Sequence, residues 1–208
     1  MPSFKLLRNE SSRALLSPIT CGKASAYIRP TIAAIYITNY CNSRCTMCDF
    51  WKNKRDPYEL SSVQWGIIFS RLKAFGINFV GVNASGEMFT RQDVFDILKH
   101  LHNLRLDFGV NSNGTLLTPE KAQQLAKLNP RAVTIGLDGV GDEAYTATRG
   151  IKDGFSLVCQ NIETLQRAKI HNIGIGTVLM KRNMHDWVNL AQYAHEKKLS
   201  GIRYTAHH

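Results

Sequence analysis

The chain has 208 residues, 44% of them hydrophobic and 20% charged, and 26 basic against 16 acidic side chains give a net charge of +10. These values are typical of one soluble domain with a sizeable core, and no apolar run approaches the roughly 20 residues of a membrane span. Because the basic residues are spread along the chain, a nucleic-acid partner is a hypothesis that rests on charge alone and is not favoured.

Residues 1–30 contain Pro18 and Pro30 and are interpreted as a peripheral lead-in to a core domain at residues 31–208. This lead-in lacks the continuous apolar segment of a secretory signal. Cys21 and Cys159 stand alone, without paired spacing, so no disulfide framework is expected. We therefore expect a cytoplasmic protein.

From residue 31 onward, short β-branched or aromatic runs alternate with longer stretches of helical periodicity. The predicted strands are Ile32–Thr38, Phe79–Asn83, Leu106–Val110, Ala132–Leu137, Ile173–Leu179 and Ile202–Thr205. The predicted helices are Ser61–Phe75, Gln92–Leu104, Pro119–Leu128, Phe155–Ala168 and His185–Lys198. Strands that alternate with helices indicate β-α units. The expected fold class is therefore α/β, an open partial (βα)6 barrel with parallel strands that ends after strand six.

The sequence predicts the apolar face of the first helix and the position of the sixth strand in the sheet. The first predicted helix places Val63, Ile67, Ile68, Leu72 and Phe75 near one face, the pattern of an amphipathic helix. After the sixth strand too few residues remain for another helix, so we expect this strand to lie at an open edge without a covering helix. We interpret the core domain as truncated at its C-terminal end, or as covered there by a partner chain, and expect the isolated piece to be poorly soluble or oligomeric.

Three cysteines, Cys41, Cys45 and Cys48, lie within eight residues, directly after the first predicted strand. Three thiols so close together on a loop can hold a metal centre. A 4Fe–4S cube usually has four thiolate ligands, so three would leave one iron open to bind something else. The alternative is a structural zinc module in which Asp49 or a histidine supplies the fourth ligand.

Polar segments follow the other predicted strands at the same end. Ser85-Gly86-Glu87 follows the second strand and Asn111–Gly114 the third, while Asp138-Gly139 and Lys181–Asn183 follow the fourth and fifth. In β-α barrels and open α/β sheets this end of the strands carries the chemistry. We therefore expect these segments to converge on one site.

Each of these residues also has an ordinary structural interpretation. Glu87 is a suitable acid for the first turn of a helix, and Asn113-Gly114 and Asp138-Gly139 are good turn dipeptides. Arg149 could be a solvated loop charge, and Met47 could be a core residue. His207 and His208 are interpreted as active-site residues, as native end residues or as remnants of an expression tag.

The Cys41-x-x-x-Cys45-x-x-Cys48 loop after a first strand resembles that of the radical S-adenosylmethionine (radical SAM) enzymes. Ser85-Gly86-Glu87 is similar to the Gly-Gly-Glu motif of that superfamily. Asn113-Gly114-Thr115, Leu137-Asp138-Gly139 and Arg149-Gly150 are similar to segments of the branch with peptide-modifying and cofactor-building members. The resemblance covers about residues 32 to 205.

The resemblance implies a 4Fe–4S cluster on Cys41, Cys45 and Cys48, with S-adenosylmethionine as the ligand of the open iron. It implies reductive cleavage of that nucleotide to a 5′-deoxyadenosyl radical, which abstracts a hydrogen atom from an unknown substrate. It also implies an electron donor such as a flavodoxin or ferredoxin. The implied nucleotide contacts are Ser85, Gly86 and Glu87 at the methionyl ammonium, Ser112 and Asn113 at the ribose, Arg149 at the methionyl carboxylate and Met47 near the adenine.

The sequence departs from the family pattern at Ser85, which replaces the first glycine of the triplet. A second departure is Gly136, which stands where many relatives carry a ribose-binding serine, and the third is the end of the chain after strand six. These departures keep a second hypothesis open, a catalytically incomplete relative that binds the cluster. A nucleic-acid-modifying radical SAM protein is a third.

Overall fold

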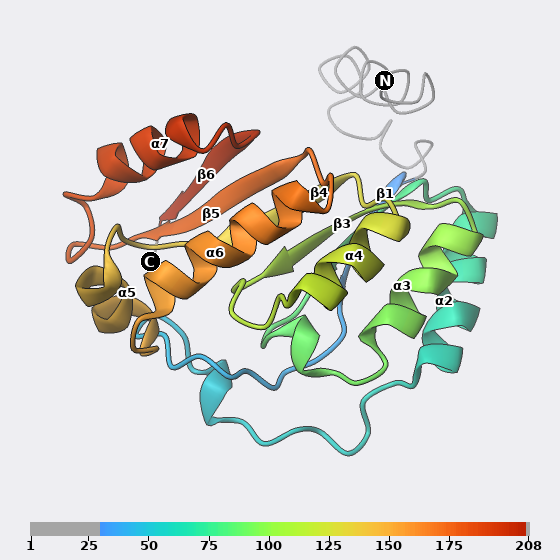
Figure 1. The fold of residues 1–208 in the computed structure, drawn as a ribbon. Coiled ribbons are helices and arrows are strands. Elements are labelled where there is room, and N and C mark those ends of the chain that lie inside the picture. The colour runs from blue at the N-terminus through green and yellow to red at the C-terminus, as the bar shows by residue number, and fades with distance from the viewer. Residues whose placement is uncertain (1–29, 207–208) are drawn as a thin grey trace, which may run out of the picture.

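The computed structural model describes residues 30–206, in which one sheet of six strands is flanked by helices (Figure 1). The strands are β1 (Ile32–Tyr36), β2 (Phe79–Asn83), β3 (Asp107–Ser112), β4 (Ala132–Gly136), β5 (Ile173–Leu179) and β6 (Gly201–Ala206). They follow one another across the sheet in chain order, and each neighbouring pair is parallel. The predicted open α/β fold with parallel strands is confirmed. The interpretations of residues 1–29, of Cys21 and of His207 and His208 lie outside the described residues.

The helices of the described part are α2 (Ser62–Phe75), α3 (Val94–Asn103), α4 (Pro119–Lys127), α5 (Asp142–Arg149), α6 (Gly154–Arg167) and α7 (Trp187–Glu196), with short 3-10 turns η2 (Phe50–Lys52) and η3 (Met88–Thr90). Local capping explains where two of them begin. The Ser61 and Gln64 side chains form a capping box on α2, and the Thr118 side chain caps α4 ahead of Pro119. Within residues 30–206 no helix is both long and apolar enough to cross a membrane.

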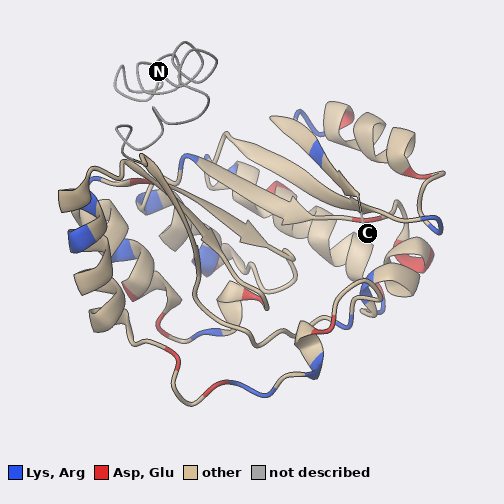
Figure 2. Cartoon of the chain, turned by 180° about the vertical axis from the view of Figure 1, so that it is seen from behind, with Lys and Arg blue, Asp and Glu red and all other residues tan. Residues whose placement is uncertain are grey.

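The core lies between the sheet and the helices. Strand residues such as Val80, Val133 and Ile135 are fully buried there, and Leu98 and Leu125 meet them from the helices. None of the helices in residues 30–206 covers the other face of the sheet, and Figure 2 shows the strands from that side in front of them. Because successive strand residues point to opposite faces, that open face carries the alternate positions of each strand.

The amphipathic face expected for α2 is buried only in part, because Ile68 and Leu72 pack against the core and the other three residues do not. Val63, Ile67 and Phe75 are 67%, 52% and 50% exposed, whereas Trp65 and Phe69 are buried. The helix packs mainly against α3, so only part of its surface meets the core. Its apolar residues occur on several sides, so the spacing alone did not identify the contact face.

The expectation for the sixth strand is half right. β6 lies at an edge of the sheet, but the predicted lack of a covering helix is wrong, because α7 packs on it (Figure 1). The Tyr204 hydroxyl donates to the Trp187 carbonyl at 2.6 Å, and the two rings meet edge to face. A crossover helix lies over the two strands that it joins, so α7 covers β6 although it precedes that strand in the chain.

Sequence reasoning missed α5 altogether. This helix of eight residues begins after Gly141, has Asp142 and Glu143 in its first turn and ends at Gly150 in the left-handed region. Acids in the first turn and a glycine just past the end are signals of a helix, so the segment was identifiable from sequence. The other differences are small shifts of element ends; for example β3 extends to Ser112 and therefore includes Asn111.

Candidate functional site

The three cysteines line an open cavity of about 280 Å³ at the carboxyl ends of the strands. We call residues 39–49, between β1 and η2, the cysteine loop. The cavity is bounded by this loop, by the segment after β2, by residues within β3 to β6 and by Arg149 of α5. The sequence-predicted residues that line it are Cys41, Cys45, Met47, Cys48, Ser85, Gly86, Ser112, Asn113 and Arg149. The segments after β2 and β3 therefore meet the cysteine loop at this cavity as expected. Asp138-Gly139 and Lys181–Asn183 do not line it, and among the predicted cluster and nucleotide contacts Glu87 does not line it either.

The thiols are half-buried, and burial sets their chemistry. Burial raises the pKa of Cys41, and it raises that of Cys45 to about 11 although the nearby Arg149 guanidinium works to lower it. The free thiols of Cys41 and Cys45 are therefore protonated at neutral pH, and a metal would have to displace the protons.

The donor set fits a cluster better than a single ion. Among residues 30–206, no three His, Cys, Asp or Glu side chains converge closely enough to hold one metal ion. In an iron–sulfur cube each thiolate binds its own iron, so its cysteines need not converge on one point. Three thiols around one side of an open cavity satisfy that requirement.

The cysteine loop is held on one side by Asn113. The Asn113 side-chain amide donates to Asn42 Oδ1 at 2.9 Å and to Ser43 Oγ at 2.8 Å. A further hydrogen bond joins the same two loops, because the Thr115 hydroxyl accepts from the Asn42 side-chain amide at 2.9 Å. The side chain of Asn113 thus joins the loop after β3 to the cysteine loop, a positioning role that its turn-forming sequence did not reveal.

On the other side, the end of α5 holds the same loop. The backbone N–H of Arg44 donates to the Arg149 carbonyl at 3.0 Å, and that of Thr46 donates to the Thr148 carbonyl at 2.8 Å. Gly150 follows with φ +67°, and a Cβ there would lie 2.8 Å from the Arg44 carbonyl oxygen. Only glycine combines this backbone conformation with so close an approach.

The Ser85-Gly86-Glu87 segment is hydrogen-bonded to the start of the cysteine loop. Gly86 N–H donates to the Thr38 carbonyl at 3.2 Å, and Glu87 N–H donates to the Tyr40 carbonyl at 2.8 Å. A Cβ on Gly86 would lie 1.9 Å from that Tyr40 oxygen, so no other residue fits. The middle glycine of the motif is therefore required by the approach of two backbones.

The Glu87 carboxylate is 1% exposed and has three protein donors. Oε1 accepts from Phe89 N–H at 3.0 Å and from the Ser112 hydroxyl at 2.9 Å, and Oε2 accepts from Asn113 N–H at 2.6 Å. Burial raises the pKa of Glu87, although these hydrogen bonds and the Arg149 charge oppose the shift. Glu87 caps η3, close to its structural interpretation, and it also fixes the backbone behind the cavity.

Arg149 is a cavity residue with a buried partner and not a solvated loop charge. Its Nε and Nη2 contact Asp138 Oδ2 at 2.8 and 2.7 Å, and Asp138 is fully buried. The guanidinium lies over Gly136, where a Cβ would be 2.6 Å from Nη1. The departure at Gly136 therefore has a physical reason, because a serine there would displace the guanidinium.

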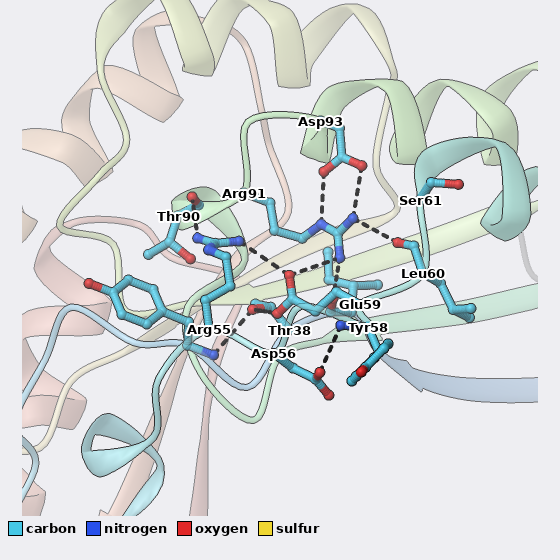
Figure 3. A network of polar contacts seen from close by, with 12 residues as sticks. Thr38, Arg55, Asp56, Tyr58, Glu59, Leu60, Ser61, Thr90, Arg91 and Asp93 are labelled. Atoms are coloured by element: carbon cyan, nitrogen blue, oxygen red, sulfur yellow. Dashed lines mark hydrogen bonds and ion pairs between the residues drawn. The ribbon is translucent and has the colours of Figure 1, made fainter.

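A second polar network, around Arg91, joins segments on both sides of the cysteine loop (Figure 3). Arg91 is 6% exposed and donates to both carboxylate oxygens of Asp93 at 2.8 Å, to the Ile37 carbonyl at 2.7 Å and to the Leu60 carbonyl at 2.8 Å. Glu59 joins it at 3.3 Å. One guanidinium thus fixes the end of β1, the segment after the cysteine loop and the turn after η3. No sequence signal distinguishes Arg91 from an exposed arginine.

Comparison with known proteins identifies the family of this chain. Residues 35–194 match the family model of the Radical SAM superfamily. The chain belongs to the radical SAM superfamily. The expectation drawn from the cysteine spacing and the Ser85-Gly86-Glu87 segment is thereby confirmed.

Curated relatives support the membership, and solved structures share the fold. The chain is 30% identical over 148 residues to the mycofactocin maturase MftC of Mycolicibacterium smegmatis, a match that covers 71% of this chain and 37% of MftC. It is 27% identical over 176 residues to an AdoMet-dependent heme synthase of Methanosarcina barkeri, covering 84% of this chain and 49% of the synthase. The structure of Streptococcus suis SuiB bound to the precursor peptide SuiA superposes with a TM-score of 0.77 at 17% identity, covering 93% of this chain and 44% of SuiB. The chain thus spans about half or less of each protein.

Proposed function

We propose that this chain is the catalytic core of a radical SAM enzyme that holds a 4Fe–4S cluster on Cys41, Cys45 and Cys48. The observation that carries the proposal is the placement of three half-buried thiols on one cavity at the strand ends of a radical SAM fold. When bound and reduced, the cluster supplies the electron that cleaves S-adenosylmethionine to methionine and the 5′-deoxyadenosyl radical that takes a hydrogen atom from the substrate.

The chain's own residues bind and orient the nucleotide. The proposed contacts are Ser85, Gly86 and Glu87 for the methionyl ammonium, Ser112 and Asn113 for the ribose, Arg149 for the methionyl carboxylate and Met47 for the adenine. All of these except Glu87 line the cavity, which supports those contacts. The buried Glu87 carboxylate would act indirectly, by holding Ser112 and the backbone of Asn113 beside the cavity. Because Asp138 holds the Nε and Nη2 side of Arg149, Nη1 is the group left to meet a carboxylate.

The class of substrate is proposed by similarity to the relatives. MftC is a maturase, and SuiB is bound to a precursor peptide in its structure, so peptide or cofactor modification is the class of chemistry proposed. An electron donor such as a flavodoxin or ferredoxin is part of the proposal, because the cluster must be reduced before each cleavage. A cytoplasmic location is also part of the proposal, because thiols that bind a cluster stay reduced there. Lys and Arg occur on helices and loops around the molecule, interspersed with Asp and Glu, and do not favour the nucleic-acid hypothesis (Figure 2).

Anaerobic reconstitution with iron and sulfide tests the proposal. We expect about four irons per chain, a brown chromophore and reductant-dependent release of 5′-deoxyadenosine. The variant with Cys41, Cys45 and Cys48 all replaced by Ala should lose the iron, whereas the matched Cys159→Ala control should keep it. Unchanged iron in the triple variant would refute the ligand assignment, and stoichiometric zinc in place of iron would favour the zinc module. A full cluster that binds the nucleotide but releases no 5′-deoxyadenosine would identify the catalytically incomplete relative.

A further inference from the structure

A second cavity adjoins the candidate site and continues along the open face of the sheet. It has a volume of about 280 Å³ and lies at the first residues of β4, β5 and β6, where Ala132, Gly174 and Gly201 line it. Thr134 and Arg203 line both cavities. The two spaces therefore meet at these residues, and Arg203 is the charged side chain at their junction.

The register of the sheet places Arg203 beside Arg149. Gly136 of β4 pairs with Gly176 of β5, and Gly176 pairs with Arg203 of β6, so the three residues form one row across the sheet. A Cβ on Gly176 would lie 4.0 Å from Arg203 Nη2. The guanidinium of Arg203 therefore reaches over β5, as that of Arg149 lies over β4.

The two arginines differ in their partners. Arg149 is neutralised by the buried carboxylate of Asp138. Within residues 30–206, Arg203 takes part in no ion pair, and neither cavity is lined by an Asp or a Glu. A guanidinium without a counter-ion, at the junction of two cavities free of carboxylates, favours an anionic ligand group.

We propose that Arg203 binds a carboxylate of the substrate, so that the enzyme acts on an acidic molecule such as a peptide with a Glu or Asp side chain. The inference rests on the proposed function, which assigns the cysteine-lined cavity to the nucleotide. The second cavity, at the starts of β4 to β6 and called the lower cavity from here on, is left to the substrate. A planar guanidinium matches a carboxylate with two parallel hydrogen bonds. Phosphate groups are usually held by clusters of free backbone N–H groups, whereas β5, over which Arg203 reaches, is paired with a strand on each side.

Binding of blocked amino acids tests the proposal directly. The probes are N-acetylglutamate N-methylamide, whose side-chain carboxylate is its only charge, its glutamine counterpart, and inorganic phosphate. Each is titrated by ligand-observed NMR into the reconstituted protein saturated with S-adenosylmethionine under argon. We expect the glutamate probe to bind about tenfold or more tightly than the glutamine probe, the preference of a charge-assisted pair.

Variants then locate the interaction. Arg203→Gln should remove the preference for the glutamate probe and Arg203→Lys should restore part of it, whereas Arg105→Gln, at an exposed arginine that lines neither cavity, should leave it unchanged. Gly201→Val adds a steric test, because a Cβ on Gly201 meets nothing within 4 Å and would enter the lower cavity without a clash. This variant should fold normally and weaken binding of both blocked amino acids.

Three results would overturn the proposal: equal affinities for the two blocked amino acids in the wild type, a preference for phosphate, or a preference unchanged in Arg203→Gln. A loss of S-adenosylmethionine affinity in Arg203→Gln would also overturn it, by assigning Arg203 to the nucleotide. Failure of the proposed function is seen separately, as a protein that takes up neither cluster nor nucleotide. The same titration on cluster-free protein then still reports whether Arg203 binds the carboxylate.

Discussion

Replacing Glu87 by Gln removes one charge from a fully buried position and keeps the size of the side chain. The single amide oxygen of Gln can replace Oε1, which accepts from Phe89 N–H and the Ser112 hydroxyl. The amide NH₂ then faces Asn113 N–H, which donates to Oε2 at 2.6 Å in the wild type. Two donors meet, and a buried N–H is left without an acceptor. We expect a loss of about 1–3 kcal/mol in the free energy of unfolding from this contact.

The same substitution should weaken nucleotide binding. Glu87 holds Ser112 and the Asn113 backbone, which are proposed to contact the nucleotide, so loss of these charge-assisted hydrogen bonds should cost about 1–3 kcal/mol of binding free energy, or roughly 5- to 150-fold in affinity. Titration calorimetry with S-adenosylmethionine under argon measures this, on protein in which iron analysis shows the cluster retained. The exposed Glu143→Gln is the matched control and should change neither stability nor affinity by more than about 0.5 kcal/mol.

The pH dependence of stability gives an independent readout. Because burial raises the pKa of Glu87 above its ordinary value of 4.5, the unfolded chain releases this proton first. The stabilising contribution of the protonated group is thus present below the ordinary pKa and is lost as pH rises toward the raised, folded value. Urea unfolding should show this decline in the wild type relative to Glu87→Gln. Parallel pH curves together with equal nucleotide affinities would refute the reasoning on both counts.

Three further substitutions test the supports of the site. Arg91→Met removes the donors of the Ile37 and Leu60 carbonyls and leaves the partly exposed Asp93 carboxylate without its partner, and we expect it to lower the unfolding free energy by about 1–3 kcal/mol in urea. Gly136→Ser places a Cβ 2.6 Å from Arg149 Nη1, so the displaced guanidinium should weaken S-adenosylmethionine binding measured by calorimetry. Gly86→Ala places a Cβ 1.9 Å from the Tyr40 carbonyl oxygen and should lower the iron taken up on reconstitution, because the start of the cysteine loop must move.

Matched controls exist for all three. Arg55→Met removes an exposed partner of Glu59 and should cost about 1 kcal/mol or less. Gly81 tolerates a Cβ at ordinary contact distances, its nearest neighbour being 3.7 Å away, so Gly81→Ala and Gly81→Ser should keep both iron and nucleotide binding. Equal stability of Arg91→Met and Arg55→Met would contradict the role given to Arg91. Wild-type behaviour of Gly136→Ser or Gly86→Ala would contradict the corresponding close approach.

The sequence by itself determined the architecture and the end of the sheet that carries the site. Buried strands such as Phe79–Asn83 and Ile173–Leu179 have bounds that agree with the prediction, because apolar runs between turn residues are a local signal. The cysteine loop was identifiable because three ligands lie on one short segment. Strand alternation then fixed which loops share an edge, since parallel strands all end on the same side.

The tertiary structure decided how that edge becomes a cavity. Asn113 holds Ser43 across 70 positions of the chain, and Arg91 holds the Ile37 carbonyl across 54. The close approach of Arg149 to Gly136 and the junction at Arg203 likewise depend on strand register and crossover packing. Such contacts leave no periodic pattern, because each depends on where two distant segments meet in the folded chain. Spacing along the chain therefore predicted the ligands and the sheet, whereas the folded geometry determined which side chains support them and which charge has no partner.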